Sequence, residues 1–261
     1  QRNFSASQSS LSTSMQRLSS GLRINSAKDD AAGLSIAERM NAQVRGMNVA
    51  IRNANDGISL AQTAEGALAK VGDSLQRMRE LAIQARNATN SSSDKDSLNK
   101  EFSELQEEIT RVLGGTSFNG KNILGADATA MTFQIGANTT ADDVVSITTE
   151  DMTANSDITS VTTGVSIDST ATTGDIKNVI DAIDTAIDTI NDQRATFGAS
   201  QGRFEAIISN LQSSVEAQSA ARSRIMDADF ASETANMSRA QILQQAGTAM
   251  IAQANQLPQN V

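Results

Sequence analysis

The feature that most constrains this chain is a heptad repeat of apolar residues between residues 175 and 218. Steps of four and three residues alternate along it, and no proline lies inside it. The apolar positions are Ile176, Ile180, Ile183, Ile187, Ile190, Phe197, Phe204, Ile208, Leu211 and Val215. Only Arg194 and Gln201 interrupt the series. A helix of roughly 65 Å with such a narrow stripe needs partner helices of similar length.

Two further segments with helical spacing supply candidate partners. The first, residues 34–86, is predicted as one helix, although Asn55–Gly57 inside it is typical of a turn. A change in spacing near Ala61 predicts a local change in supercoil. The second, residues 94–112, precedes a glycine pair that favours helix termination. The predicted fold is therefore mainly α, a rod of long antiparallel helices packed as a coiled coil or bundle.

Thinner amphipathic helices are predicted near both ends of the chain. Their apolar positions are Leu11, Met15, Leu18 and Leu22 at one end, and Met237, Ile242, Leu243 and Met250 at the other. Helices with such narrow stripes are marginal in water when isolated. We expect the two to pair and to leave part of each stripe for neighbouring copies. Residues 21–33 are predicted to be an ordered connector.

The composition changes between residues 126 and 175, where eight acidic residues, thirteen threonines and no basic residue occur. Alternating apolar residues predict short strands at 131–135, 145–147 and 165–167. The region from about 115 to 172 is therefore expected to be a small β-rich insertion between two helical arms.

Three domains are predicted from this layout. Residues 1–32 and 221–261 contribute the terminal helices with their connectors. Residues 33–125 and 173–220 form a rod-like helical domain. Residues 126–172 form a small, variable β-rich segment.

Composition excludes several classes of function. The formal net charge of −9 argues against a nucleic-acid partner. The chain contains neither histidine nor cysteine, which excludes imidazole catalysis, disulfides and the usual zinc sites. No apolar run approaches the roughly 20 residues that span a bilayer, and no secretory signal peptide is recognised. We predict no enzymatic activity, cofactor, metal ion or membrane insertion.

Two kinds of motif have both a functional and a structural interpretation. Residues 115–121 match most of a phosphate-binding loop, but Asn122 stands where that motif needs serine or threonine. A β-hairpin turning at Asn119 and Gly120 is favoured instead. Three pairs of adjacent carboxylates are interpreted as surface or capping groups rather than acid–base pairs. They are Asp29–Asp30, Asp142–Asp143 and Glu150–Asp151.

Two long runs near the ends of the chain are distinctive. The first is LSSGLRINSAKDDAAGLSIAERM at Leu18–Met40, and the second is MSRAQILQQAG at Met237–Gly247. Together with Gln253–Val261, they closely resemble bacterial flagellin, the protein of the flagellar filament. The resemblance covers essentially the whole chain outside about 126–172. Flagellins extend slightly beyond both ends of this sequence, so the chain is expected to lack the extreme terminal residues, and its insertion is short.

The resemblance implies a structural subunit that polymerises with copies of itself into the extracellular flagellar filament, for swimming motility. The terminal helices would form the inner domain of that filament and the rod-like domain would surround it. Export through the flagellar type III secretion system would need no cleaved signal peptide. Further implied partners are an export chaperone and the filament cap and junction proteins.

The resemblance also implies recognition by the Toll-like receptor with which animal hosts sense flagellin. The family's recognition positions match Arg77, Leu81, Gln84 and Glu101. The first three are spaced at i, i+4 and i+7 and therefore share one helix face. The alternative interpretation is that the same residues form a packing surface between copies.

Other classes of protein stay open at this point. A hook–filament junction protein or a minor flagellin-like protein would share the helical rod without forming long homopolymers. A secreted, membrane-active helical effector would also contain paired amphipathic helices. A protease within the insertion, as some flagellins have, would need a motif such as His-Glu-x-x-His, which a histidine-free chain lacks.

Overall fold

A computed structural model describes residues 2–256 of the chain, which forms two compact units. The terminal unit combines the two ends of the chain, residues 1–46 and 213–261. The central unit is residues 47–212. Helices dominate both units and the strands are few and short, which confirms the predicted fold class.

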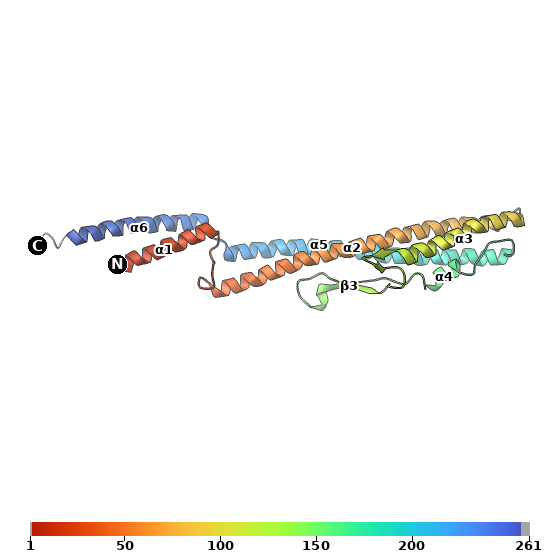
Figure 1. The fold of residues 1–261 in the computed structure, drawn as a ribbon, viewed down its shortest axis with the longest axis horizontal. Coiled ribbons are helices and arrows are strands. Elements are labelled where there is room, and N and C mark those ends of the chain that lie inside the picture. The colour runs from red at the N-terminus through yellow and green to blue at the C-terminus, as the bar shows by residue number, and fades with distance from the viewer. Residues whose placement is uncertain (1, 257–261) are drawn as a thin grey trace. The chain divides into compact units, whose positions relative to one another are not determined.

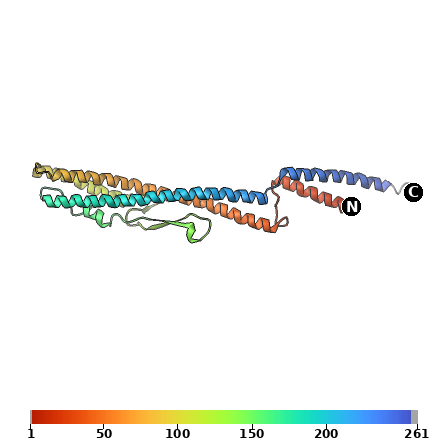
Figure 2. The same ribbon diagram turned by 180° about the vertical axis from the view of Figure 1, so that it is seen from behind.

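Three long helices form the central unit. α2 (Ala31–Ala85) and α5 (Thr173–Met226), which also extend into the terminal unit, run side by side in opposite directions (Figures 1 and 2). α3 (Ser92–Gly115) returns along them. It begins with a capping box, because the Ser91 hydroxyl accepts from Asp94 N and the Asp94 carboxylate accepts from Ser91 N. The prediction of long antiparallel helices is therefore confirmed.

The tripeptide Asn55–Gly57 does not interrupt α2. A side-chain carbon at Gly57 would lie 2.8 Å from the ring of Phe204, so glycine at this position lets α5 approach closely. The same ring meets Phe133 of strand β3 (Ala130–Gln134) edge to face, with ring centroids 5.6 Å apart. Phe204 thus packs against both α2 and the insertion.

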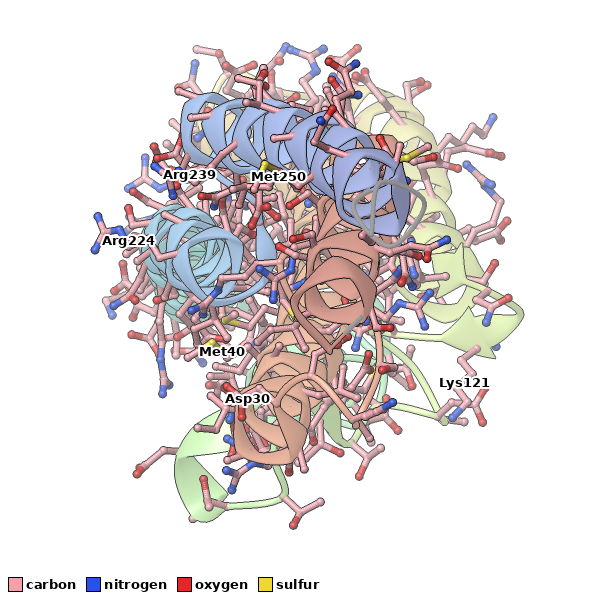
Figure 3. The ribbon with its side chains drawn as sticks, turned by 90° about the vertical axis from the view of Figure 1, so that its left-hand side faces the viewer. Asp30, Met40, Lys121, Arg224, Arg239 and Met250 are labelled. Atoms are coloured by element: carbon pink, nitrogen blue, oxygen red, sulfur yellow. The ribbon has the colours of Figure 1, made fainter. Side chains whose placement is uncertain are left out.

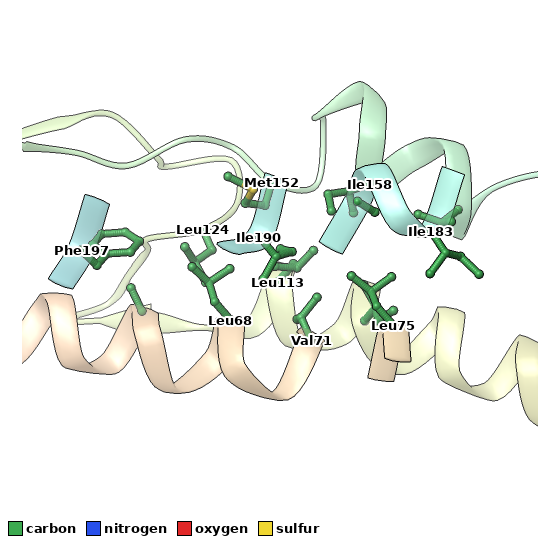
Figure 4. Close-up of a cluster of buried hydrophobic side chains, with 14 of the residues drawn as sticks. Leu68, Val71, Leu75, Leu113, Leu124, Met152, Ile158, Ile183, Ile190 and Phe197 are labelled. Carbon is green, nitrogen blue, oxygen red and sulfur yellow. The ribbon is translucent and has the colours of Figure 1, made fainter. Parts of the chain in front are cut away.

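The apolar core of the central unit lies between α2, α3, α5 and the insertion (Figure 4). The residues labelled there are Leu68, Val71 and Leu75 of α2, Leu113 of α3, Leu124, Met152 and Ile158 of the insertion, and Ile183, Ile190 and Phe197 of α5. Each aliphatic side chain buried in this way stabilises the fold by about 1.5–3 kcal/mol. The insertion therefore contributes directly to the core of the central unit.

The segment that matched most of a phosphate-binding loop forms a β-hairpin. Strand β1 (Ser117–Phe118) pairs with β2 (Lys121–Asn122) in antiparallel register. Asn119 and Gly120 between them have φ angles of 49° and 78°, the left-handed conformation that a two-residue hairpin turn requires. The hairpin prediction is confirmed.

The remaining sheet of the insertion consists of two strands. β3 pairs with β4 (Val144–Thr148) in antiparallel register, and the 3₁₀ helix η1 (Ala141–Asp143) lies in the loop between them. The strands predicted at 131–135 and 145–147 are confirmed within one residue. A short helix, α4 (Ser156–Thr162), follows and was not predicted.

The third predicted strand, at residues 165–167, is wrong, because this segment is irregular. Its backbone bonds to side chains of α3 instead of to a neighbouring strand. Ile167 N donates to Asn99 Oδ1 at 2.8 Å, and Gln106 Nε2 donates to Val165 O at 3.1 Å. These side-chain partners satisfy backbone groups that a sheet would otherwise satisfy.

The terminal unit pairs the two ends of the chain. α1 (Arg2–Ser20) lies alongside α6 (Phe230–Gln256), as the sequence predicted (Figure 1). Neither helix buries many apolar side chains, so each depends on the other.

An ordered connector, residues 21–30, joins α1 to α2 and lies against the end of α5. Arg23 N donates to Met226 O at 2.6 Å, and Ile24, Ala37 and Met226 form a small apolar cluster. The connector prediction is confirmed, although the connector is shorter than predicted: it was expected to end at residue 33, and α2 begins at Ala31. α5 continues to Met226 rather than ending near residue 218.

Candidate assembly and recognition surfaces

A polar cluster joins the two terminal helices. Ser14 Oγ donates to Glu233 Oε2 at 2.9 Å, and Arg17 Nη1 donates to Glu233 Oε1 at 2.8 Å. The hydrogen bond from Arg17 lowers the pKa of the Glu233 carboxyl most, and the bond from Ser14 adds to the effect. This cluster was not predicted from the sequence, because its members lie outside the predicted apolar stripes.

The predicted apolar residues of the terminal helices are only partly covered. Those that are half-buried are Leu11, Leu18, Leu22 and Met237. Those that are exposed are Met15 (56%), Ile242 (65%), Leu243 (54%) and Met250 (70%), the last labelled on α6 in Figure 3. Large apolar side chains gathered on one helix and left in water mark a surface that binds a partner.

The heptad stripe of α5 divides into a buried row and a half-buried row. The buried positions are Ile176, Ile183, Ile190, Phe197 and Phe204, seven residues apart. The half-buried positions are Ile180, Ile187, Ile208, Leu211 and Val215. Three further residues of α5 are buried, each three positions after an isoleucine of the buried row. They are Val179, Ala186 and Gln193. The stripe is therefore rotated slightly from the predicted one, because α5 contacts the insertion as well as α2.

The two residues that interrupt the heptad stripe meet the same carboxylate of α2. Gln201 Nε2 donates to Glu65 Oε2 at 3.0 Å, and Arg194 Nη2 lies 3.9 Å from Glu65 Oε1. Arg194 Nε is buried and has no hydrogen-bond partner among the described residues. The interruptions therefore form one polar layer between the two long helices, close to the change in spacing near Ala61.

A charged network covers the face of α2 and α3 that the sequence predicted for receptor recognition. Arg77 Nε donates to Glu101 Oε1 at 2.7 Å, and Arg77 Nη1 donates to Glu80 Oε2 at 2.9 Å. The bond to Glu101 is the main reason that the pKa of Arg77 is raised. Gln84 is exposed on the same helix, and its carbonyl accepts from Asn90 Nδ2 at 2.6 Å.

Leu81 differs from the other predicted recognition positions, because its side chain is 1% exposed and belongs to the core of the central unit. The expectation that Leu81 shares an accessible face with Arg77 and Gln84 is therefore wrong. The buried side of α2 lies next to this face. Leu81, four residues after Arg77, falls on the buried side.

The paired carboxylates serve as local caps where the structure gives them partners. Asp29 Oδ2 accepts from the backbone N–H groups of Asn25 and Ser26, and these bonds lower the pKa of Asp29. The Thr140 hydroxyl likewise lowers the pKa of Asp143. Across the described residues, no cluster of acidic side chains could hold a metal ion. Within residues 2–256, no helix is long and apolar enough to cross a membrane.

Comparisons with known proteins match both arms of the chain. The family model described as "Bacterial flagellin N-terminal helical region" matches residues 1–129, and that for the C-terminal helical region matches residues 180–261. A flagellin of Halalkalibacterium halodurans is 45% identical over 95% of this chain and 89% of its own length. A flagellin of Bacillus subtilis is 41% identical over 99% of this chain and 93% of its own.

A solved structure is similar as well. The crystal structure of Bacillus cereus flagellin has a TM-score of 0.52 and 34% identity, covering 61% of this chain and 88% of that chain. The family matches cover both helical arms, and the relatives are matched over nearly their whole length. The chain therefore belongs to the bacterial flagellin family, whose members are structural subunits of the extracellular flagellar filament.

Proposed function

We propose that copies of this chain polymerise through the apolar stripes of α1 and α6. The observation that supports this most strongly is that Ile242, Leu243 and Met250 are more than half exposed although α6 is paired with α1. Covering each such side chain with a neighbouring copy stabilises the assembly by up to about 1.5–3 kcal/mol. The terminal unit then forms the inner domain of the filament, and the helical rod of the central unit surrounds it.

The weak internal packing of the terminal unit suits export before assembly. α1 and α6 are held together by the polar cluster at Glu233 and by few buried apolar side chains, of which Ala240 is the one on α6 among the described residues. A helix pair of this kind unfolds easily, which fits passage through the type III secretion channel. An export chaperone would cover the same apolar stripe first, and cap and junction proteins would cover it at the filament ends.

Electron microscopy of filaments tests the assembly surface. Ile242→Asp places a charge among the exposed apolar side chains of α6 and should abolish long filaments. Gln241→Asp is the matched control, because it adds the same charge at the neighbouring exposed polar position of α6. Filaments of Ile242→Asp as long and as abundant as those of the control would contradict the proposal.

A receptor-binding role is proposed for the exposed residues Arg77, Gln84 and Glu101. The Arg77–Glu101 bond at 2.7 Å supports it, since this bond holds a guanidinium and a carboxylate together at the surface of two helices. Arginine anchors of this kind often dominate an interface. Leu81 is buried and does not contact the receptor. It supports this surface by packing α2 against the core.

Signalling by unassembled protein tests this role. Arg77→Ala should weaken the receptor response roughly five- to thirtyfold, the effect of losing about 1–2 kcal/mol at an interface. Lys70→Ala is the control, because Lys70 is also an exposed cation of α2 that pairs with a nearby acid, Asp73. A response of Arg77→Ala equal to that of the control would reject the assignment.

A further inference from the structure

A groove of about 430 Å³ lies between α5 and the loop that joins β3 to β4. Its floor is apolar and includes Ile135, Ile207 and Leu211, while its rim carries Arg203 and Asp142. Within the described part of the chain, neither rim side chain forms an ion pair or a hydrogen bond. An apolar floor between two unpaired charges of opposite sign is the composition of a binding site.

The loop wall of this groove is fixed before anything binds. Ile135 N donates to Asp143 O at 2.7 Å, and the Asp143 carboxylate accepts from Thr140 N at 3.0 Å. Asn53 Nδ2 of α2 donates to Gln134 O at 2.9 Å and ties the end of β3 to the helix. A preformed wall loses little conformational freedom on binding, so more of the contact energy is retained.

An exposed isoleucine on α2 has the complementary composition. Ile83 is 49% exposed, and among the described residues of the central unit only Val49 is a comparably exposed large apolar side chain. Glu80 lies about one turn before Ile83, and Arg86 directly follows the last residue of α2. Arg86 has no side-chain partner within the described residues, whereas Glu80 already accepts from Arg77 Nη1 at 2.9 Å. This segment therefore offers an apolar side chain between an unpaired base and an acid that already has one partner.

We propose that Ile83 of one copy docks into the groove of a second copy, with Arg86 directed to Asp142 and Glu80 to Arg203. This inference rests on the filament function of the family and assigns one of the contacts between copies. Charge complementarity selects the occupant, because the docked segment presents an acid and a base where the groove rim presents a base and an acid.

One chain cannot fill its own groove. Phe204, next to Arg203, packs on Gly57, whereas Ile83 lies 26 residues further along α2, or about 39 Å away. The contact therefore joins two different patches on two copies. Such a head-to-tail contact can repeat from copy to copy, as a filament requires.

The contact is small and depends on the rest of the filament. It buries little more than one isoleucine and a few rim groups, far less than a stable dimer interface needs. Once the terminal helices hold neighbouring copies close, the docking becomes effectively intramolecular and its modest energy suffices. We expect no dimer through this groove in dilute monomer.

Disulfide trapping tests the contact directly, because the chain contains no cysteine. Filaments sheared from cells that carry Ile83→Cys together with Leu211→Cys should cross-link on mild oxidation. The product on a non-reducing gel should be a ladder of dimers, trimers and longer species. Each copy forms one disulfide through Cys at position 83 and a second, with another copy, through Cys at position 211. Ile83→Cys with Thr185→Cys, at an exposed position of α5 outside the groove, should give no ladder.

A charge exchange gives a second measurement. Arg86→Glu should raise the concentration of free monomer in equilibrium with filaments roughly two- to fivefold, and adding Asp142→Arg should restore it. Two results would overturn the docking contact and leave the filament function intact. One is filaments of the Ile83→Cys, Leu211→Cys variant that give no ladder, and the other is a free-monomer concentration that Asp142→Arg does not restore. A wild-type protein that forms no filaments would overturn the filament function and this contact with it.

Discussion

At the scale of single residues, two glycines of α2 respond to a methyl group in opposite ways. At Gly66 an added side-chain carbon would have open space around it to 4 Å, so Gly66→Ala should raise the free energy of unfolding by up to about 1 kcal/mol. Gly57 lies against the Phe204 ring, so Gly57→Ala should lower it by about 1–3 kcal/mol. Urea denaturation of the monomer measures both. Equal stabilisation by the two substitutions would show that Phe204 does not require glycine at position 57.

Glu233 makes the terminal helix pair sensitive to acid. The hydrogen bond from Arg17 lowers its pKa in the folded state relative to the ordinary value of 4.5. Because the folded-state pKa is the lower one, the stabilisation is present above about pH 4.5 and is lost as the pH falls through the folded-state pKa. Glu233→Gln should remove this part of the pH dependence.

Amide exchange of α1 and α6 between about pH 3 and pH 6, corrected for intrinsic rates, checks this prediction. Glu216→Gln, at an exposed carboxylate of α5, is the control and should keep the wild-type profile. If Glu233→Gln also follows the wild-type profile, the polar cluster does not govern the pairing of α1 with α6.

The residue scale is also where sequence reasoning about the recognition surface fails. Helical spacing placed Leu81 beside Arg77, but spacing alone does not show where a core stripe ends. Leu81 is buried because α2 packs against more than one neighbour, which widens its covered face. The hydrogen bond between Ser14 and Glu233 could not be predicted either, because residues 219 positions apart share no pattern in the sequence.

At the scale of elements, the polar layer of Glu65, Arg194 and Gln201 interrupts an otherwise apolar seam. Glu65→Leu alone leaves two polar side chains without their partner and should lower the free energy of unfolding by about 1–2 kcal/mol. The figure is modest because the Arg194 and Glu65 side chains are 38% and 39% exposed. Replacing all three residues by leucine should instead raise stability, since it restores the seam. Urea denaturation of both variants tests the pair of expectations.

A stabilising effect of Glu65→Leu by itself would show that the polar layer contributes nothing to the fold. The layer also favours one register, because sliding α5 by one heptad would move Arg194 and Gln201 away from Glu65. This second role explains why an ion pair of little net energy persists in the seam.

The helices were predictable because their patterns are long. Ten positions at heptad spacing predict α5 as one unbroken helix. In α2, helical spacing continues on both sides of Asn55–Gly57 and outweighs that local turn signal. The insertion has only short patterns, and there tertiary partners decide. Residues 165–167 alternate like a strand, yet Asn99 and Gln106 of α3 take the hydrogen bonds that a strand would need. α4 is too short to show helical spacing.

At the scale of the whole molecule, the apolar stripes of the terminal helices couple folding to assembly. In the monomer, α6 keeps Ile242, Leu243 and Met250 in water, so opening α1 from α6 exposes little further apolar surface. We expect weak amide protection of both terminal helices in the monomer and strong protection in filaments, where neighbours cover the stripes. The core helices around Leu75 should be protected in both states.

Hydrogen exchange on monomer and filament of the same protein measures this difference, and the protected core serves as its internal reference. Terminal helices as well protected in the monomer as in the filament would contradict coupled ordering and assembly. Ile242→Asp sharpens the test, because position 242 is already exposed in the monomer. The substitution should leave monomer protection unchanged while preventing the gain on assembly, which separates a role between copies from a role within one chain.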